Sequence, residues 1–173
     1  MKKNQKTLLW ISGGLTAAIC LVMNFILIPM IEKNTAGLRC FDMNSFGYTF
    51  EQAKQFLTLL DDHARSIYLH VQLPLDFFYP VAYTAFFMLA ITALRGKASA
   101  LLALPGALAA SDYIENVCTI KMLRAMDVTP ELARFASAVT VTKSVLMDLV
   151  FVLLAALLIV WLIKRKKKAR EKK

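Results

Sequence analysis

The sequence contains few of the residues on which catalytic and metal-binding motifs depend. Its 173 residues include two histidines and three cysteines. These form no CxxC pair, no HExxH motif and no zinc-ligand spacing. A GxSxG nucleophile turn and a glycine-rich phosphate loop are also absent. The sequence therefore gives no signal for a zinc, haem or nucleotide site.

Long polar stretches are equally scarce, because apolar residues make up 58% of the chain and its mean hydropathy is +0.54. A helix needs about 20 mostly apolar residues to cross about 30 Å of hydrocarbon. We predict four membrane spans, at residues 8–30, 74–94, 98–118 and 135–163. The third is the weakest, because its apolar part ends at Ala110. The composition thus predicts one all-α integral membrane domain over residues 1–173, a four-helix bundle.

Acidic residues are outnumbered, with 12 Asp and Glu against 21 Lys and Arg, and the net charge is +9. The basic residues gather in three places: before the first span, in the turn with Arg95 and Lys97, and in the tail 164–173. Cytoplasmic flanks of membrane spans collect Lys and Arg. We therefore predict a multi-pass protein of the plasma (inner) membrane with both termini cytoplasmic and with residues 31–73 and 119–134 outside.

The basic tail has two functional interpretations. No aromatic residues interleave its charges, which argues against nucleic acid as a partner. A basic segment next to a span anchors the topology and contacts anionic lipid headgroups. The predicted partner of the tail is thus the lipid bilayer.

The outer segment 31–73 contains a loop followed by a predicted amphipathic helix over residues 49–72. Thr49 followed three residues later by Gln52 is a capping-box pattern. We predict that this helix lies at the outer interface, apolar side down. Pro74 suits the first turn of a helix, so a bend there is favoured, and one long kinked helix over residues 50–94 is the alternative. A disulfide between Cys40 and Cys118 and two free thiols are equally compatible with the sequence.

Polar residues inside the predicted spans fall at one depth. Counting about 1.5 Å per residue from the cytoplasmic ends of the spans places them about 21 to 27 Å up. Ionised groups that face lipid cost on the order of 2.5–3.5 kcal/mol each, so carboxylates in this layer must face inward. We predict a polar pocket that opens outward. The residues of the layer are Asn24, Asp76, Asp112, Glu115 and Asp148.

Pro80 adds a further polar group to this layer. Because proline lacks an N–H, the carbonyl of Asp76 loses its helical hydrogen bond. We take Asp76, Asp112 and Asp148 as the centre of the site and as the catalytic candidates if there is a reaction. The ligand-binding set comprises Asn24, Arg65, Asp76, Tyr79, Tyr83, Asp112, Glu115, Asn116 and Asp148.

Simpler interpretations compete at several of these positions. Asp76 is a first-turn carboxylate at the wet interface if Pro74 opens the span. Glu115 and Asn116 could emerge into water, and Lys143 could extend outward along the membrane. No histidine joins the layer, so a metal there would be a hard cation such as Mg²⁺, Ca²⁺ or Mn²⁺. We assign no metal ligands.

Three function classes fit these observations. The leading hypothesis is binding of an amphiphilic or lipid-like ligand, with or without acid–base chemistry on its headgroup. A proton- or cation-coupled small transporter is the second, and it requires a path inward past Tyr83. The third is a non-catalytic membrane partner whose polar layer is a structural network. Whether the protein is an enzyme stays open at this stage.

Overall fold

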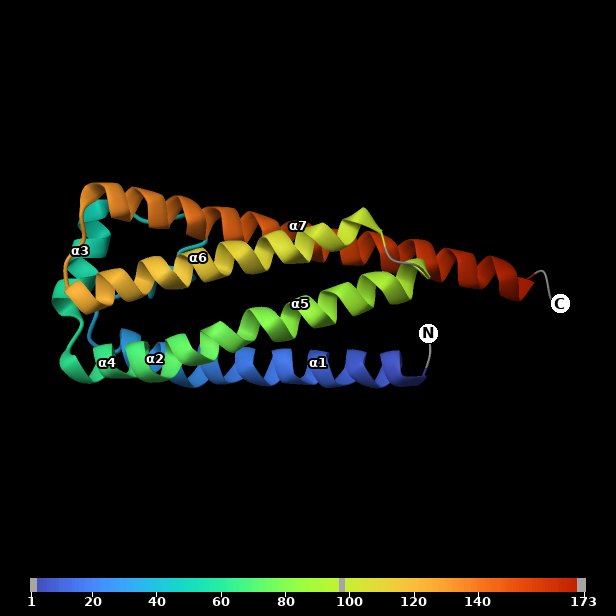
Figure 1. The fold of residues 1–173 in the computed structure, drawn as a ribbon, viewed down its shortest axis with the longest axis horizontal. Coiled ribbons are helices and arrows are strands. Elements are labelled where there is room, and N and C mark those ends of the chain that lie inside the picture. The colour runs from blue at the N-terminus through green and yellow to red at the C-terminus, as the bar shows by residue number, and fades with distance from the viewer. Residues whose placement is uncertain (1–2, 97–98, 171–173) are drawn as a thin grey trace.

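The computed structural model describes residues 3–96 and 99–170, which are almost entirely helical and contain no strand (Figure 1). The chain begins with α1 (Lys3–Val22), which continues through a π-helical turn, Met23–Leu27, into α2 (Ile28–Glu32). A loop with a 3₁₀ turn at Phe41–Met43 leads to α3 (Phe50–Leu59). The remaining elements are α4 (Asp62–Ile67), a π-helical turn at Tyr68–Gln72, α5 (Leu73–Arg95), a 3₁₀ turn at Ala100–Leu102, α6 (Ala103–Ala125) and α7 (Pro130–Arg170).

Three helical stretches are long and apolar enough to cross a membrane: Asn4–Glu32, Asp62–Arg95 and Pro130–Arg170. These correspond to the first, second and fourth predicted spans. The other predicted span, 98–118, overlaps α6, which does not reach the same hydropathy. The all-α class and the membrane character are therefore supported, whereas the fourth span is not supported by hydropathy.

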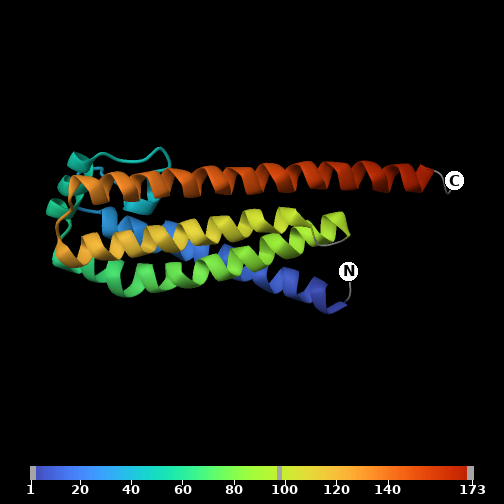
Figure 2. The same cartoon turned by 45° about the horizontal axis from the view of Figure 1, so that its top comes forward.

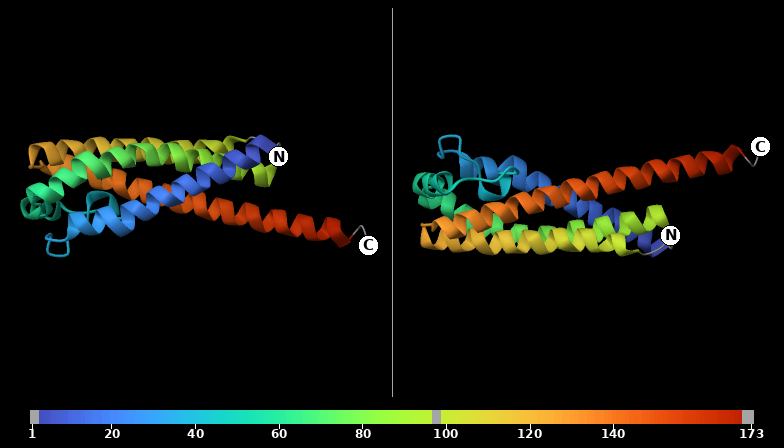
Figure 3. Two further views of the ribbon diagram at one scale, coloured as in Figure 1. Left: turned by 90° about the horizontal axis from the view of Figure 1, so that it is seen from below. Right: turned by 90° about the horizontal axis from the view of Figure 1, so that it is seen from above.

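The long helices lie side by side (Figures 1 and 2). α1 packs along α5, α5 packs on α6 and on α7, and α6 packs on α7. Figure 3 shows α7 continuing past the ends of the other helices toward the C-terminus. This arrangement brings the middle of α5, α6 and α7 together, and these three helices supply the polar residues described below.

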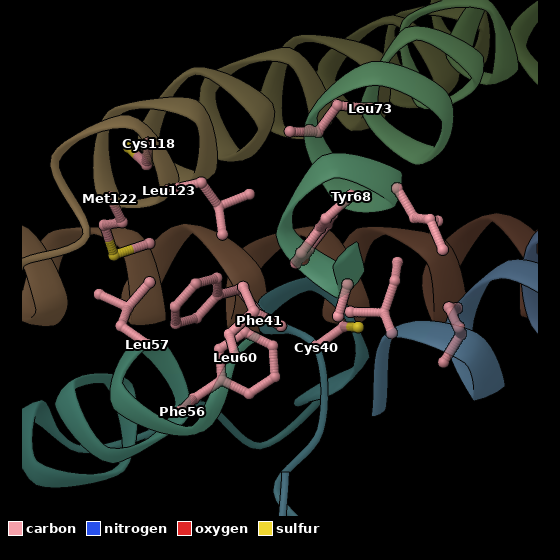
Figure 4. Packing of buried hydrophobic residues seen from close by; sticks show 14 of the residues in the cluster. Cys40, Phe41, Phe56, Leu57, Leu60, Tyr68, Leu73, Cys118, Met122 and Leu123 are labelled. Carbon is pink, nitrogen blue, oxygen red and sulfur yellow. The ribbon is translucent and has the colours of Figure 1, made fainter. Parts of the chain in front are cut away.

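α3 crosses the end of the bundle that is remote from the two termini (Figure 1). The predicted capping box is confirmed, because the Gln52 N–H donates to Thr49 Oγ1 and the Thr49 N–H donates to Gln52 Oε1. Phe56 from α3 packs edge-to-face against Phe41 and Tyr68, with ring centroids 5.0 and 6.4 Å apart. Figure 4 shows these three rings among the other side chains of the apolar core.

The predicted single helix over 49–72 is wrong, and so is the bend at Pro74. The helix is interrupted at Leu60, whose backbone is extended. Asp61 caps the start of α4 by accepting a hydrogen bond from the Ala64 N–H. From Asp62 the backbone stays helical through Arg95. The π-helical turn at Tyr68–Gln72 directly precedes Pro74, and such a turn lets a proline enter a helix without ending it. Asp76 is therefore well inside a continuous helix.

All three cysteines are free thiols. Cys40 and Cys118 are buried in the same apolar core but stand apart in Figure 4. Burial and the nearby Asp42 and Glu32 carboxylates raise the pKa of the Cys40 thiol well above its usual value. The structure therefore favours the free-thiol alternative.

Candidate functional site

Buried polar side chains converge between α5, α6 and α7. Asp76 and Tyr83 come from α5, and Asp112 and Glu115 come from α6, all with at most 5% of their surface exposed. Lys143 reaches them from α7, with 15% of its side chain exposed. The predicted polar layer is thus present for residues on α5 and α6, and Lys143 points inward rather than outward along the membrane.

Two carboxylates in this group have identified partners. The Lys143 ammonium contacts the Glu115 carboxylate and lies 3.6 Å from Asp112 Oδ1. The Tyr83 hydroxyl donates to Asp112 Oδ2 at 2.9 Å. Asp112 is therefore held from α5 and α7 at once, which fixes the spacing of the three helices at this depth.

The carbonyl that Pro80 leaves without a helical donor has a partner from the neighbouring helix. Asn116 Nδ2 donates to the Asp76 carbonyl oxygen at 3.2 Å, and both groups are buried. One residue further on, the Tyr113 hydroxyl donates to the Phe77 carbonyl at 3.1 Å. The Asp76 carbonyl, which Pro80 leaves without a helical donor, and the next carbonyl along α5 thus both accept from side chains of α6.

Asp42 is a member of the site that the sequence reasoning missed. The Tyr68 hydroxyl donates to Asp42 Oδ1 at 2.9 Å. The charge of Asp42 interacts with those of Asp76, Asp112, Glu115 and Lys143. The only available signal was its place between the apolar residues Phe41 and Met43 in an otherwise polar loop. We call Asp42, Asp76, Asp112, Glu115 and Lys143 the acidic cluster.

The loop between Met43 and Thr49 packs against α7. The Tyr48 N–H donates to Ser137 Oγ on α7 at 2.8 Å. Gly47 has a positive φ of 85°, and a Cβ there would stand 2.6 Å from Ser137 Oγ, so only glycine allows this approach. Burial, with the Glu115 charge, raises the pKa of the Tyr48 hydroxyl, which therefore remains protonated over the physiological range.

The acidic cluster carries more negative than positive groups. Four carboxyl groups face one ammonium group, and the Asp76 carboxyl makes no hydrogen bond or ion pair within the described part of the chain. Both amide atoms of the buried Gln72, one turn before Asp76, are also without hydrogen-bond partners among the described residues. Unpaired polar groups are costly in a low-dielectric interior, so this arrangement suits a cationic or hydrogen-bonding ligand.

Asp148 does not join the buried carboxylates. It is exposed on α7 and lines a groove of about 180 Å³ together with Ser45, Lys143, Ser144 and Met147. Lys143 belongs to both places, because its ammonium contacts the cluster while its side chain forms part of the groove wall. Lys143 therefore lies between this groove and the acidic cluster.

Two other predicted residues lie away from the acidic cluster. Asn24 is exposed, and its Nδ2 donates to the Cys20 carbonyl of its own helix at 2.9 Å. Arg65 donates from Nε to the Leu123 carbonyl at 2.9 Å and from Nη2 to the Arg124 carbonyl at 3.2 Å. It thereby satisfies carbonyls of the last turn of α6. Arg65 also lines a separate depression of about 320 Å³ with Asp62 and His70.

Tyr79 lies between Asp76 and Tyr83 along α5, and its ring packs edge-to-face on Tyr83 with centroids 5.1 Å apart. Below Tyr83, the interior is filled by Phe87, Leu108 and Val150, each at most 3% exposed. The acidic cluster is therefore closed on its inner side by an apolar layer. Across residues 3–96 and 99–170, no three His, Cys, Asp or Glu side chains converge closely enough to hold a metal ion.

Comparisons with known proteins return no match to a family model, to a curated protein or to a solved structure.

Proposed function

We propose that the chain is a multi-pass plasma-membrane protein with four spans, formed by α1 with α2, α4 with α5, α6, and α7. The exposed residues of α6 support its role as a span. Over residues 104–118 they form an apolar stripe, whereas Ser111, Asp112, Glu115 and Asn116 are buried. Such an inside-out pattern suits a helix whose polar face is shielded by neighbours in lipid. The stripe comprises Ala107, Ala110, Ile114 and Val117.

The distribution of charge supports an orientation with both termini in the cytoplasm. Lys6, Arg95 and the basic residues of 164–170 lie at the end of the bundle that carries both termini (Figure 1). Positively charged residues concentrate on the cytoplasmic side of spans. In this orientation the acidic cluster and α3 lie toward the outer face.

Within this membrane frame, we propose that the acidic cluster binds the headgroup of an amphiphile that carries a positive charge. The observation that carries the proposal is the excess of buried carboxyl groups over the single Lys143 ammonium. A ligand ammonium would supply the missing positive charge, and the unpartnered Gln72 amide would supply hydrogen bonds.

The groove beside Lys143 gives such a ligand a route from the outer leaflet. Asp148 stands at this groove and offers a first carboxylate to an approaching cation. Exposed apolar residues of α7, including Leu149 and Val152, continue from the groove toward the bilayer centre. An acyl chain along this face would remain in lipid while the headgroup enters the protein.

A structural polar network is the second candidate function. It is favoured by the Lys143 contact with Glu115 and by the Tyr83–Asp112 hydrogen bond, since both join helices without a ligand. Transport receives less support, because Phe87, Leu108 and Val150 close the bundle below Tyr83. The two leading candidates differ in what they predict for Asp76.

The proposal is tested by mass spectrometry of the amphiphiles that co-purify with the wild-type protein and with Asp76→Asn. Asparagine keeps the side-chain shape and removes the charge, so the variant should fold and retain several-fold less cationic amphiphile. Asp148→Asn should have a smaller effect, and the exposed Asp62→Asn serves as the matched control. A structural network predicts instead that Asp76→Asn leaves retention unchanged and that Asp76→Leu mainly lowers thermal stability.

A further inference from the structure

A second groove lies at the opposite end of the bundle from the acidic cluster. It has a volume of about 760 Å³ and is lined by α1, α5 and one residue of α7, Leu158. Small residues create it, since Gly13 and Gly14 on α1 face Ala90 and Ala93 on α5. An added Cβ at Gly14 would have no atom within 4 Å, so space remains beside this position.

Basic residues lie beyond the groove-lining residues of α1 and α7, toward the two termini. Lys6 is one turn before Trp10 on the face of α1 that lines the groove, because residues four apart share a helix face. Arg165 follows Leu158 on the corresponding face of α7 by two turns. Its guanidinium packs over the Trp161 ring, 5.2 Å from the ring centroid and one turn nearer to Leu158 along α7.

The described residues of this half of the bundle include no carboxylate side chain. Residues 3–31, 77–111 and 149–170 contain no aspartate or glutamate. An apolar groove with basic residues beyond one end is complementary to a molecule with an acyl chain and an anionic headgroup. A general coat of lipid would require neither the groove nor this alignment of charge.

We infer that the groove between α1 and α5 binds one acyl chain of an anionic phospholipid, with the lipid phosphate at Lys6 and Arg165. The occupant comes from the leaflet at the end that carries both termini. This site is independent of the acidic cluster, whose charge and position suit a ligand of the opposite sign.

Native mass spectrometry of the full chain tests this inference with phosphatidylglycerol and phosphatidylcholine of identical acyl chains. The wild-type protein should retain phosphatidylglycerol several-fold better. Gly14→Phe places a ring in the groove and should abolish the preference, whereas Leu15→Phe, on an exposed position beside it, should preserve it.

The double variant Lys6→Gln/Arg165→Gln changes only exposed side chains and keeps the test valid if Gly14→Phe does not fold. It should bring retention of the two lipids to the same level. Equal retention by the wild-type protein would overturn the inference, and so would a preference that survives Gly14→Phe. Conversion of a dimer to a monomer by Gly14→Phe would also overturn it, because the groove would then belong to a second copy of the chain.

Discussion

Asn116 on α6 compensates for a missing backbone hydrogen bond in α5. Its amide donates to the Asp76 carbonyl, which lacks a helical partner because residue 80 is proline. Truncation in Asn116→Ala leaves that buried carbonyl unpaired and should destabilise the protein by about 1–3 kcal/mol. The measurement is reversible unfolding in detergent, with Asn24→Ala as the control because Asn24 is exposed and bonds only within its own helix.

A double-mutant cycle isolates the cause of this effect. Pro80→Ala returns an N–H to position 80, so the Asp76 carbonyl regains its helical hydrogen bond. In the Pro80→Ala background, Asn116→Ala should therefore cost clearly less than in the wild-type background. Equal costs in the two backgrounds would show that Asn116 stabilises the protein through some other contact.

Lys143 is the only cation in contact with the buried carboxylates among the described residues. Removing one partner of a buried ion pair leaves an uncompensated charge, so Lys143→Met should destabilise the protein by about 3–5 kcal/mol. The double variant Lys143→Met/Glu115→Gln should recover much of this loss. Thermal unfolding measures both, and an unaltered midpoint in Lys143→Met would contradict the charge balance described above.

Residue-level reasoning from the sequence located part of the site. Asp76, Asp112 and Glu115 could be predicted as inward-facing because a carboxylate in an apolar helix has few alternatives. Asp42 could not, since its position depends on how the loop folds back onto α7 through Gly47 and Tyr48. Thr140, Ser144 and Asp148 are spaced four residues apart, but each such step rotates the side chain by about 40° around α7. Thr140 is therefore buried, Ser144 is half-buried and Asp148 is exposed.

At the level of elements, the break between α3 and α4 depends on Asp61. Hydrogen bonds from the Ala64 N–H and the Asn34 amide lower the pKa of the Asp61 carboxyl below its usual value. A carboxyl whose folded-state pKa is lowered stabilises the fold above its unfolded pKa of about 3.9, and this contribution is lost as the pH falls through the folded-state value.

Acid should therefore loosen the start of α4. Hydrogen exchange of the α4 amides should accelerate below about pH 4, beyond the intrinsic pH dependence of exchange. Asn is as good an N-cap as Asp but does not titrate in this range, so Asp61→Asn should remove the additional acceleration. The same acceleration in both proteins would assign it to another group.

The α6 helix is the element that hydropathy describes least well. Its buried face carries Ser111, Asp112, Glu115, Asn116 and Thr119, which lowers its average hydropathy although its exposed stripe is apolar. If that stripe faces lipid, Ile114→Arg should impair membrane insertion or stability by about 2.5–3.5 kcal/mol. Lys121→Ala, further along the same exposed face of α6 and beyond the predicted span, is the control. Normal accumulation and stability of Ile114→Arg would place this face in water.

The long helices could be predicted from the sequence more accurately than the connections between them. Hydrophobic blocks identified the three long apolar helices, and the Thr49–Gln52 pattern located the start of α3. The break between α3 and α4 at Leu60–Asp61 was missed because the apolar periodicity of residues 53–67 continues across it. Pro74 was interpreted as a helix start, since a π-helical turn leaves no signature in the sequence.

At the scale of the whole molecule, charge is segregated along the bundle. The half near the termini is free of carboxylates over residues 77–111 and 149–170, and the acidic cluster lies in the other half. If the basic end is cytoplasmic, single cysteines at Asn4 and Lys168 should resist an impermeant thiol reagent in intact cells. A cysteine at the fully exposed Phe46 should react in the same cysteine-free background. Labelling of the cysteine at position 4 from outside would show that the orientation is the opposite of the one proposed.

The central claim is that the acidic cluster binds a cationic headgroup, and a pair of simple amphiphiles tests it most directly. Dodecylamine and dodecanol share one chain length, and at neutral pH only the amine is charged, as for a lysine side chain. The account predicts that dodecylamine raises the thermal unfolding temperature of the wild-type protein more than dodecanol does, and that Asp76→Asn removes the difference. Equal shifts with the two amphiphiles, or a difference that persists in Asp76→Asn, would contradict the account.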